Sequence, residues 1–249
     1  MVNATNSDPG ASKRFLDMPL EEAMRTQRAM RRLRPDPVDD DLLLHVLELA
    51  LKAPNGGNRQ NVEFLVLRDA AAKIGLARLN RVAWSLYGSL WRWFARGDDK
   101  TLRAMQAVDY AARHYEEAPV IVVVCLRVVS YGPIVSGFRL PYPAFWDAIF
   151  YGTAFPAVQN LLLAARAAGL GAALNVMPLW DLPLARTTLG LPPWVTPVAV
   201  VPLGWPRGHF GPVSRPPVET VVHVDRWGNL AFQNDASDIG PSGSERTDP

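Results

Sequence analysis

Short apolar runs, separated by longer stretches of mixed polarity, set the strand pattern of this chain. Residues 119–126 and 198–203 are continuously apolar, which predicts strands buried on both faces of a sheet. Residues 62–67 are β-branched and apolar enough for another strand. Further strands are expected at 171–176 and 219–224. The pattern therefore predicts a small sheet whose main strands lie in the core.

Between these runs, apolar residues recur at the spacing of helices. After the acidic triplet at 39–41, for example, Leu42, Val46 and Leu49 fall on one helical face. Helices are expected over residues 19–30, 39–52, 69–79, 82–95, 99–116, 148–168 and 180–189. Helices that alternate with a few buried strands, after an early helical pair, predict an α+β sandwich.

The segments at the two ends of the chain differ from the rest. Residues 1–14 and 233–249 are small and polar, which predicts disordered tails. Between them no long linker rich in Pro, Gly or Ser divides the chain, so residues 15–230 are expected to form one domain.

Composition excludes several classes of function. The net charge is +2 over 249 residues, so a polyanion such as a nucleic acid is not an expected partner. No apolar run reaches the roughly 18 residues needed to span a bilayer, and the N-terminus lacks the apolar core of a signal peptide. We therefore expect a cytoplasmic protein that does not bind a membrane.

The metal-binding residue types are sparse. Cys125 is the one cysteine, and its apolar surroundings predict a small buried residue in a strand. A single thiol also fits a reducing compartment. The histidines His45, His114, His209 and His223 are far apart in sequence and show no ligand spacing, so no metal site is predicted.

A basic cluster follows the first predicted helix. Arg28, Arg31, Arg32 and Arg34 precede a Pro-rich turn, where guanidinium groups can bind a phosphate dianion. The same cluster is also typical of an exposed helix end, because cations stabilise helix C-termini.

Two further segments offer complementary groups. In the loop Ala53–Gln60, paired glycines permit close backbone approach, and Asn55, Asn58 and Gln60 bring amides that suit the polar edge of a flat ring. The alternative is a plain loop that stops a helix. Residues 169–178 form a helix–Gly–strand junction, and Arg215 lies in a Pro-rich loop near the C-terminus.

In this order and at these separations, the segments resemble the FMN-dependent nitroreductase family over about residues 20–230. The family pattern Arg-Arg-Ser-x-Arg is matched from Gln27 to Arg31, with Gln27 for the first Arg and Ala29 for the Ser. The resemblance implies that Arg28 and Arg31 bind the FMN phosphate and that Ala29 is a further cofactor-binding position. The lost Ser hydroxyl removes a hydrogen bond that contributes about 0.5–1.5 kcal/mol.

The resemblance assigns the remaining site residues in the same way. The family loop Ala-Pro-Ser-Gly-Gly-Asn-x-Gln-Pro-Trp implies that Asn55, Asn58 and Gln60 contact the flavin, although Asn61 and Val62 replace its Pro and Trp. By resemblance, Leu174, Asn175 and Val176 supply the backbone N–H clamp at flavin N5, and Arg215 reaches the phosphate. No catalytic side chain is expected.

The family also implies a fold and an activity. The fold is a nitroreductase-like sandwich, with a mixed central sheet flanked by helices. The protein is a homodimer with the flavin at the subunit interface, which the helix at 148–168 and the C-terminal extension after Val218 would form. The activity is an FMN oxidoreductase that uses NADH or NADPH and reduces nitroaromatic, quinone or similar acceptors by ping-pong hydride transfer.

Other functions on the same scaffold stay open. They are a reductive dehalogenase, an enzyme that fragments flavin, a protein that binds FMN without turnover, and a scaffold without flavin. Aromatic residues crowd residues 82–95, and a long loop-like segment covers 130–146. Both are expected either to pack on the core or to form a lid for an aromatic substrate.

Overall fold

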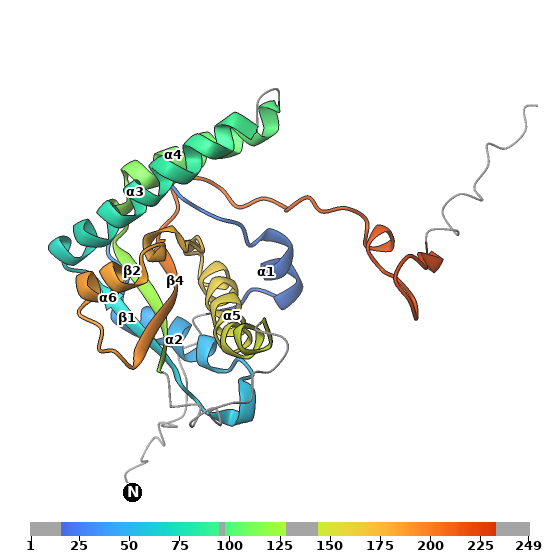
Figure 1. Ribbon diagram of the computed structural model, residues 1–249, viewed down its shortest axis with the longest axis horizontal. Coiled ribbons are helices and arrows are strands. Elements are labelled where there is room, and N and C mark those ends of the chain that lie inside the picture. Colours follow the sequence, from blue (N-terminus) through green and yellow to red (C-terminus); the bar gives the residue numbers. More distant parts are fainter. Residues whose placement is uncertain (1–15, 95–97, 128–143, 233–249) are drawn as a thin grey trace, which may run out of the picture. The chain divides into compact units, whose positions relative to one another are not determined.

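The computed structural model describes residues 16–94, 98–127 and 144–232 (Figure 1). The predicted tails, 1–14 and 233–249, lie outside these residues, as does most of the predicted lid segment at 130–146. The chain divides into two compact units, Met1–Gly211 and Pro212–Pro249.

The first unit is built around a four-stranded sheet. Its strands are β1 (Val62–Leu67), β2 (Val120–Arg127), β3 (Gly171–Ala172) and β4 (Val195–Gly204). They pair in the order β1-β2-β4-β3, and every pair is antiparallel. The prediction of a mixed sheet was therefore wrong for the four described strands, because each neighbour in space runs in the opposite direction.

Alternation along β2 explains why its sequence is continuously apolar. Val120, Val122 and Val124 belong to one core cluster, and Ile121 and Val123 belong to another. Because successive side chains point to opposite faces of a sheet, β2 separates two hydrophobic cores. The prediction of a strand buried on both faces is confirmed.

Helices cover both faces of the sheet. The first core is closed by α2 (Asp40–Leu51) and α5 (Ala144–Ala167), with α1 (Leu20–Thr26) packed on α5. The second is closed by α3 (Ala70–Phe94) together with α6 (Leu182–Leu189).

The remaining long helix, α4 (Asp99–Arg113), pairs with the outer part of α3 (Figure 1). This pair positions the residues of one wall of the candidate site. At the start of α2, the Asp39 carboxylate accepts hydrogen bonds from the N–H groups of Asp41 and Leu42, a standard N-cap.

Four further sequence predictions need correction. The helix expected over residues 19–30 is shorter, because α1 ends at Thr26 and Gln27 has an extended backbone. The helices expected at 69–79 and 82–95 are one continuous helix, α3, because Asn80 and Arg81 between them do not break a helix. The strand expected at 171–176 is regular only at Gly171–Ala172, with one isolated bridge from Asn175 to Val200. The strand expected at 219–224 is absent, and the 3-10 turn η4 (Val218–Thr220) begins that segment instead.

One described segment has the length and composition of a membrane span, Ala148–Ala167 in α5. In this structure it packs against α1, α2 and the sheet, and Val158 and Leu161 are fully buried in the first core. In this structure the segment is therefore a central helix of the first core.

Cys125 lies on β2 with 1% of its surface exposed, as predicted. Burial, and secondarily the carboxylate of Glu63 opposite it on β1, raises the pKa of the thiol to about 12. At pH 8 the folded protein is therefore expected to react with iodoacetamide roughly a thousandfold more slowly than the chain in denaturant. Timed alkylation followed by mass spectrometry measures this, and rapid labelling of the native protein would contradict the burial.

Candidate functional site

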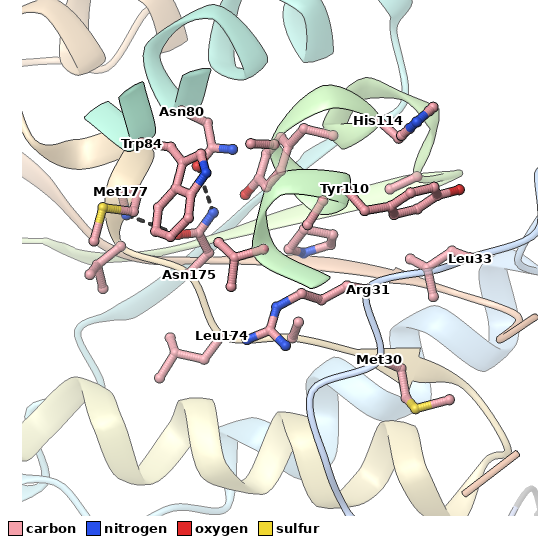
Figure 2. Close-up of a pocket in the computed structure, with 18 of the residues that line it drawn as sticks. Met30, Arg31, Leu33, Asn80, Trp84, Tyr110, His114, Leu174, Asn175 and Met177 are labelled. Atoms are coloured by element: carbon pink, nitrogen blue, oxygen red, sulfur yellow. Dashed lines mark hydrogen bonds between the residues drawn. The ribbon is translucent and has the colours of Figure 1, made fainter. Parts of the chain in front are cut away.

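The first unit contains a cavity of about 440 Å³, within the range of about 300–1,000 Å³ typical of small-molecule sites. It lies where the segment after α1, the outer part of α3, the end of α4 and the segment after β3 meet (Figure 2). The side chains that matter below are those of Arg31, Asn80, Trp84, Tyr87, Trp91, Tyr110, Tyr115, Phe155, Leu174, Asn175 and Val176.

The segment after α1 is fixed along the outer edge of β3. The Met30 N–H donates to the carbonyl of Ala172 at 3.0 Å, and Ala29 forms a parallel bridge to the same residue. At Gly171 a Cβ atom would lie 2.9 Å from both Met30 Cβ and Leu33 Cδ2, so this close approach requires glycine. The sheet edge thereby determines where Arg31 enters the cavity.

Arg31 is the cation of the cavity wall. Its side chain is half-buried, and burial lowers the pKa of the guanidinium from its ordinary value. The group still stays charged, because arginine is not deprotonated in proteins. Among the described residues its side chain has no hydrogen-bond or ion-pair partner. Figure 2 shows it extending into the cavity on the side where Leu174 lies. A desolvated cation of this kind favours a ligand oxygen or anion.

Backbone donors line the cavity beside Arg31. The N–H of Asn175 donates to the carbonyl of Val200 at 2.9 Å, and the N–H of Ala173 points the same way, toward Pro202 at 3.4 Å. Successive N–H groups of an extended chain alternate in direction, so those of Leu174 and Val176 point away from β4. Neither has an acceptor among the described residues, and both residues line the cavity.

Aromatic side chains from α3 and α4 form the opposite wall. Trp84, Tyr87 and Trp91 succeed one another along α3, with the Tyr87 and Trp91 ring centroids 5.7 Å apart. The Trp84 indole donates to the Asp109 carboxylate of α4 at 2.6 Å, which holds the two helices together at this point. Three of the aromatic residues in 82–95 therefore belong to the cavity wall, whereas Trp93 and Phe94 do not line it and are exposed.

The structure brings some of the sequence-predicted site residues together and leaves others apart. Arg31, Leu174, Asn175 and Val176 line the cavity. Ala29 lies beside β3, where it forms an isolated parallel bridge to Ala172. Arg28 is exposed, with its guanidinium beside Gly211. Their contact with a flavin stays a prediction.

The loop amides lie elsewhere in the same chain. Asn55 and Gln60 line a separate pocket of about 150 Å³ beside Thr153 of α5. There the Asn55 side chain accepts from the Gln60 N–H at 3.1 Å, and Gln60 Nε2 donates to Asn58 at 3.4 Å. Asn58 and Gln60 both have a φ of 49°, a left-handed backbone conformation that residues other than glycine adopt uncommonly.

Arg215 belongs to the second unit. Its Nη1 donates to the carbonyl of Ser214 at 2.8 Å. Its role at the phosphate stays a prediction.

Sequence reasoning missed several cavity residues. Asn80 carries a recognisable signal, because it stands four residues from both Leu76 and Trp84 on the buried face of α3. A polar residue inside an apolar stripe indicates a buried polar partner. Tyr110, Tyr115 and Phe155 carry no such signal.

Comparison with known proteins agrees with this geometry. A model of the Nitroreductase family matches residues 24–205. The chain is 28% identical over 219 residues to an NADH dehydrogenase of Thermus thermophilus, covering 79% of this chain and 91% of the relative.

Solved structures share the fold. An NADPH:FMN oxidoreductase from Vibrio harveyi, complexed with NAD+, superposes with a TM-score of 0.62 at 20% identity, covering 87% of this chain and 82% of the other. An iodotyrosine deiodinase bound to FMN and 3-iodo-L-tyrosine gives 0.63 at 20% identity, covering 84% and 100%.

The chain has a helix-flanked antiparallel sheet with a cavity at its β3 edge, and it shares its fold with these solved structures. The chain belongs to the Nitroreductase family. A putative NADH dehydrogenase/NAD(P)H nitroreductase of Methanothermobacter thermautotrophicus is 24% identical to it over 214 residues, which cover 84% of this chain and 88% of the relative.

Proposed function

We propose that this protein is an FMN-dependent enzyme that transfers electrons from NADH or NADPH to electron-poor aromatic acceptors such as quinones and nitroaromatics. One observation carries the proposal. Arg31 lines the same cavity as Leu174 and Val176, whose N–H groups have no acceptor in the described part of the chain, and an aromatic wall lies opposite. When bound, FMN supplies the hydride chemistry, and the protein supplies placement and electrostatics.

The groups present in the cavity fit a flavin ring. Such a ring is flat and apolar, with a polar edge that accepts hydrogen bonds. The backbone donors of Leu174 and Val176 can serve that edge without covering a ring face, because they lie at the edge of the sheet. Arg31 can stabilise negative charge on the ring or on the phosphate.

The wall opposite the sheet edge favours an uncharged aromatic acceptor. Trp84, Tyr87 and Trp91 offer faces for stacking. The one carboxylate of the described lining, Glu117, is 2.7 Å from His114 Nδ1 and thus already engaged. A zwitterionic amino acid needs partners for both of its charges, so the lining gives a dehalogenase no specific support.

Nicotinamide and acceptor are each a planar ring that needs the space under the aromatic wall. We therefore infer that they bind in turn, which gives ping-pong kinetics. Among the described residues no side chain has to act as acid or base for this exchange.

A second copy of the chain completes the proposed site. The amides Asn55, Asn58 and Gln60 do not line the 440 Å³ cavity of their own chain. If they contact the flavin as the family resemblance implies, they belong to the neighbouring subunit of a homodimer. The site is then formed by Arg31 and β3 from one subunit and by the loop from the other.

The visible spectrum of the purified protein tests the proposed function. The protein is expected to be yellow, or to become so when FMN is added, and its flavin band should bleach with NADH or NADPH. Menadione or nitrofurazone should restore the band. Protein that cannot be loaded with FMN would refute the proposal, and loaded protein that neither nicotinamide bleaches would indicate FMN storage.

A further inference from the structure

A polar pair lies at the buried end of the otherwise apolar cavity wall. Asn80 of α3 has 3% of its surface exposed, and Asn175 follows β3. Asn175 Nδ2 donates to Asn80 Oδ1 at 2.9 Å, the bond drawn between these two side chains in Figure 2. Buried amides of this kind are retained only where their hydrogen bonds are satisfied.

The backbone fixes which way both amides point. The Met177 N–H can only donate, and it lies 2.9 Å from the Asn175 side chain, so the Asn175 atom it meets is the oxygen. The nitrogen of Asn175 then faces Asn80, whose nearer atom must be its oxygen. These hydrogen bonds run from Met177 through Asn175 to Asn80, and the amide nitrogen of Asn80 is the last group in the series.

That nitrogen has no acceptor among the described residues, although Asn80 lines the cavity. The neighbouring polar group is the Tyr115 hydroxyl, which is fully buried beside Asn175 and makes no hydrogen bond of good geometry to any residue that the structure describes. Burial raises the pKa of Tyr115 well above its ordinary value, so the hydroxyl stays uncharged. Asn80 therefore presents an uncharged donor to the cavity, and the orientation of that donor follows from the backbone contact of Asn175.

We propose that Asn80 donates a hydrogen bond to an uncharged oxygen of a bound ligand, a carbonyl or a nitro oxygen, and that Asn175 holds Asn80 in place for this contact. An amide donor suits a neutral oxygen, whereas Arg31 is available for a full anion. The inference rests on the proposed function. The oxygen belongs either to the pyrimidine edge of the flavin or to the acceptor, and these two sources are separable by experiment.

The variant Asn80→Asp tests the proposal at pH 8. It keeps the size of the side chain and the oxygen that accepts from Asn175, and it removes the NH2 donor. Asn80→Ala removes both groups. The matched control is Gln106→Glu, the same amide-to-acid change at an exposed position of α4. Thermal melting and circular dichroism establish that each variant is folded.

Two readouts separate the sources of the oxygen. If it is a flavin carbonyl, both Asn80 variants are expected to raise the FMN dissociation constant about 10-fold or more, measured by flavin fluorescence, and to shift the flavin band. If it belongs to the acceptor, FMN affinity stays unchanged and the reoxidation of reduced enzyme by menadione slows by a similar factor, while reduction by NADH does not. Either result supports the proposal.

FMN affinity and menadione reoxidation that both stay within about twofold of wild type in folded Asn80 variants would overturn it. That result leaves the proposed function intact, because wild type still binds FMN. If the wild-type protein binds no FMN, both the proposed function and the proposed role of Asn80 are refuted.

Discussion

Replacing Arg31 by alanine is expected to weaken FMN binding by about 10- to 100-fold, since hydrogen bonds to charged groups contribute about 1.5–3 kcal/mol. The guanidinium is half-buried, lines the cavity and has no protein partner among the described residues. It is thus desolvated before the ligand arrives, and its favourable interactions are made only with the ligand. Titration of the apoprotein with FMN, followed by flavin fluorescence, measures the change.

Two variants make this result specific to the position. Arg34→Ala removes the same charge three residues along the segment, where the side chain is exposed and lies 3.4 Å from Asp36, and it should bind FMN like wild type. Arg31→Lys keeps the charge but loses the planar fork of donors, so an intermediate affinity is expected. Equal loss in Arg31→Ala and Arg34→Ala would show that only the overall positive charge matters.

A heterodimer of two different site variants is expected to recover about half of the wild-type FMN content, because a symmetric dimer made in this way contains one intact site and one doubly defective site. One chain would carry Arg31→Ala and the other Asn58→Gly. Glycine suits Asn58 because the residue has φ of 49°, so the side chain is removed without strain. Two affinity tags isolate the mixed dimer for measurement.

The homodimers of each variant serve as controls, and both are expected to contain little FMN. If the site were complete within one chain, every site in the mixed dimer would carry at least one defect, and no recovery would occur. An Asn58→Gly homodimer with normal FMN content would show that the Asn58 side chain contributes nothing to the site.

The sequence predicted the core because burial leaves a direct trace in it. The continuous apolar run of β2 follows from its position between two hydrophobic cores, and the apolar spacing of α2 follows from packing on the first of them. Helix α3 was predicted as two pieces, since its middle, around Asn80 and Arg81, is polar. At this point a hydrogen bond between Asn80 and Asn175 takes the place of the apolar contact that the helical pattern predicts.

The direction and the pairing of the strands were harder to predict from the sequence. The sheet proved antiparallel in its four described strands, and the segment at 219–224 does not form a strand. A strand-like composition shows that a segment can enter a sheet, but neighbours and register depend on long-range contacts that no local window contains.

For the candidate site, too, some features could be predicted from the sequence and others could not. The chemical groups of the site could be predicted from residue types, because guanidinium groups, amides and the glycines that permit close approach are visible in any sequence, as at Arg31 and Gly171. Which of these groups meet depends on the folded chain. It placed Arg31 beside Leu174 and Val176, set the loop amides in another pocket, and turned the Asn80 nitrogen outward. These placements depend on the direction in which each backbone N–H points and on which sheet edge has no further strand beside it. Both properties belong to the folded backbone and are not visible in the sequence.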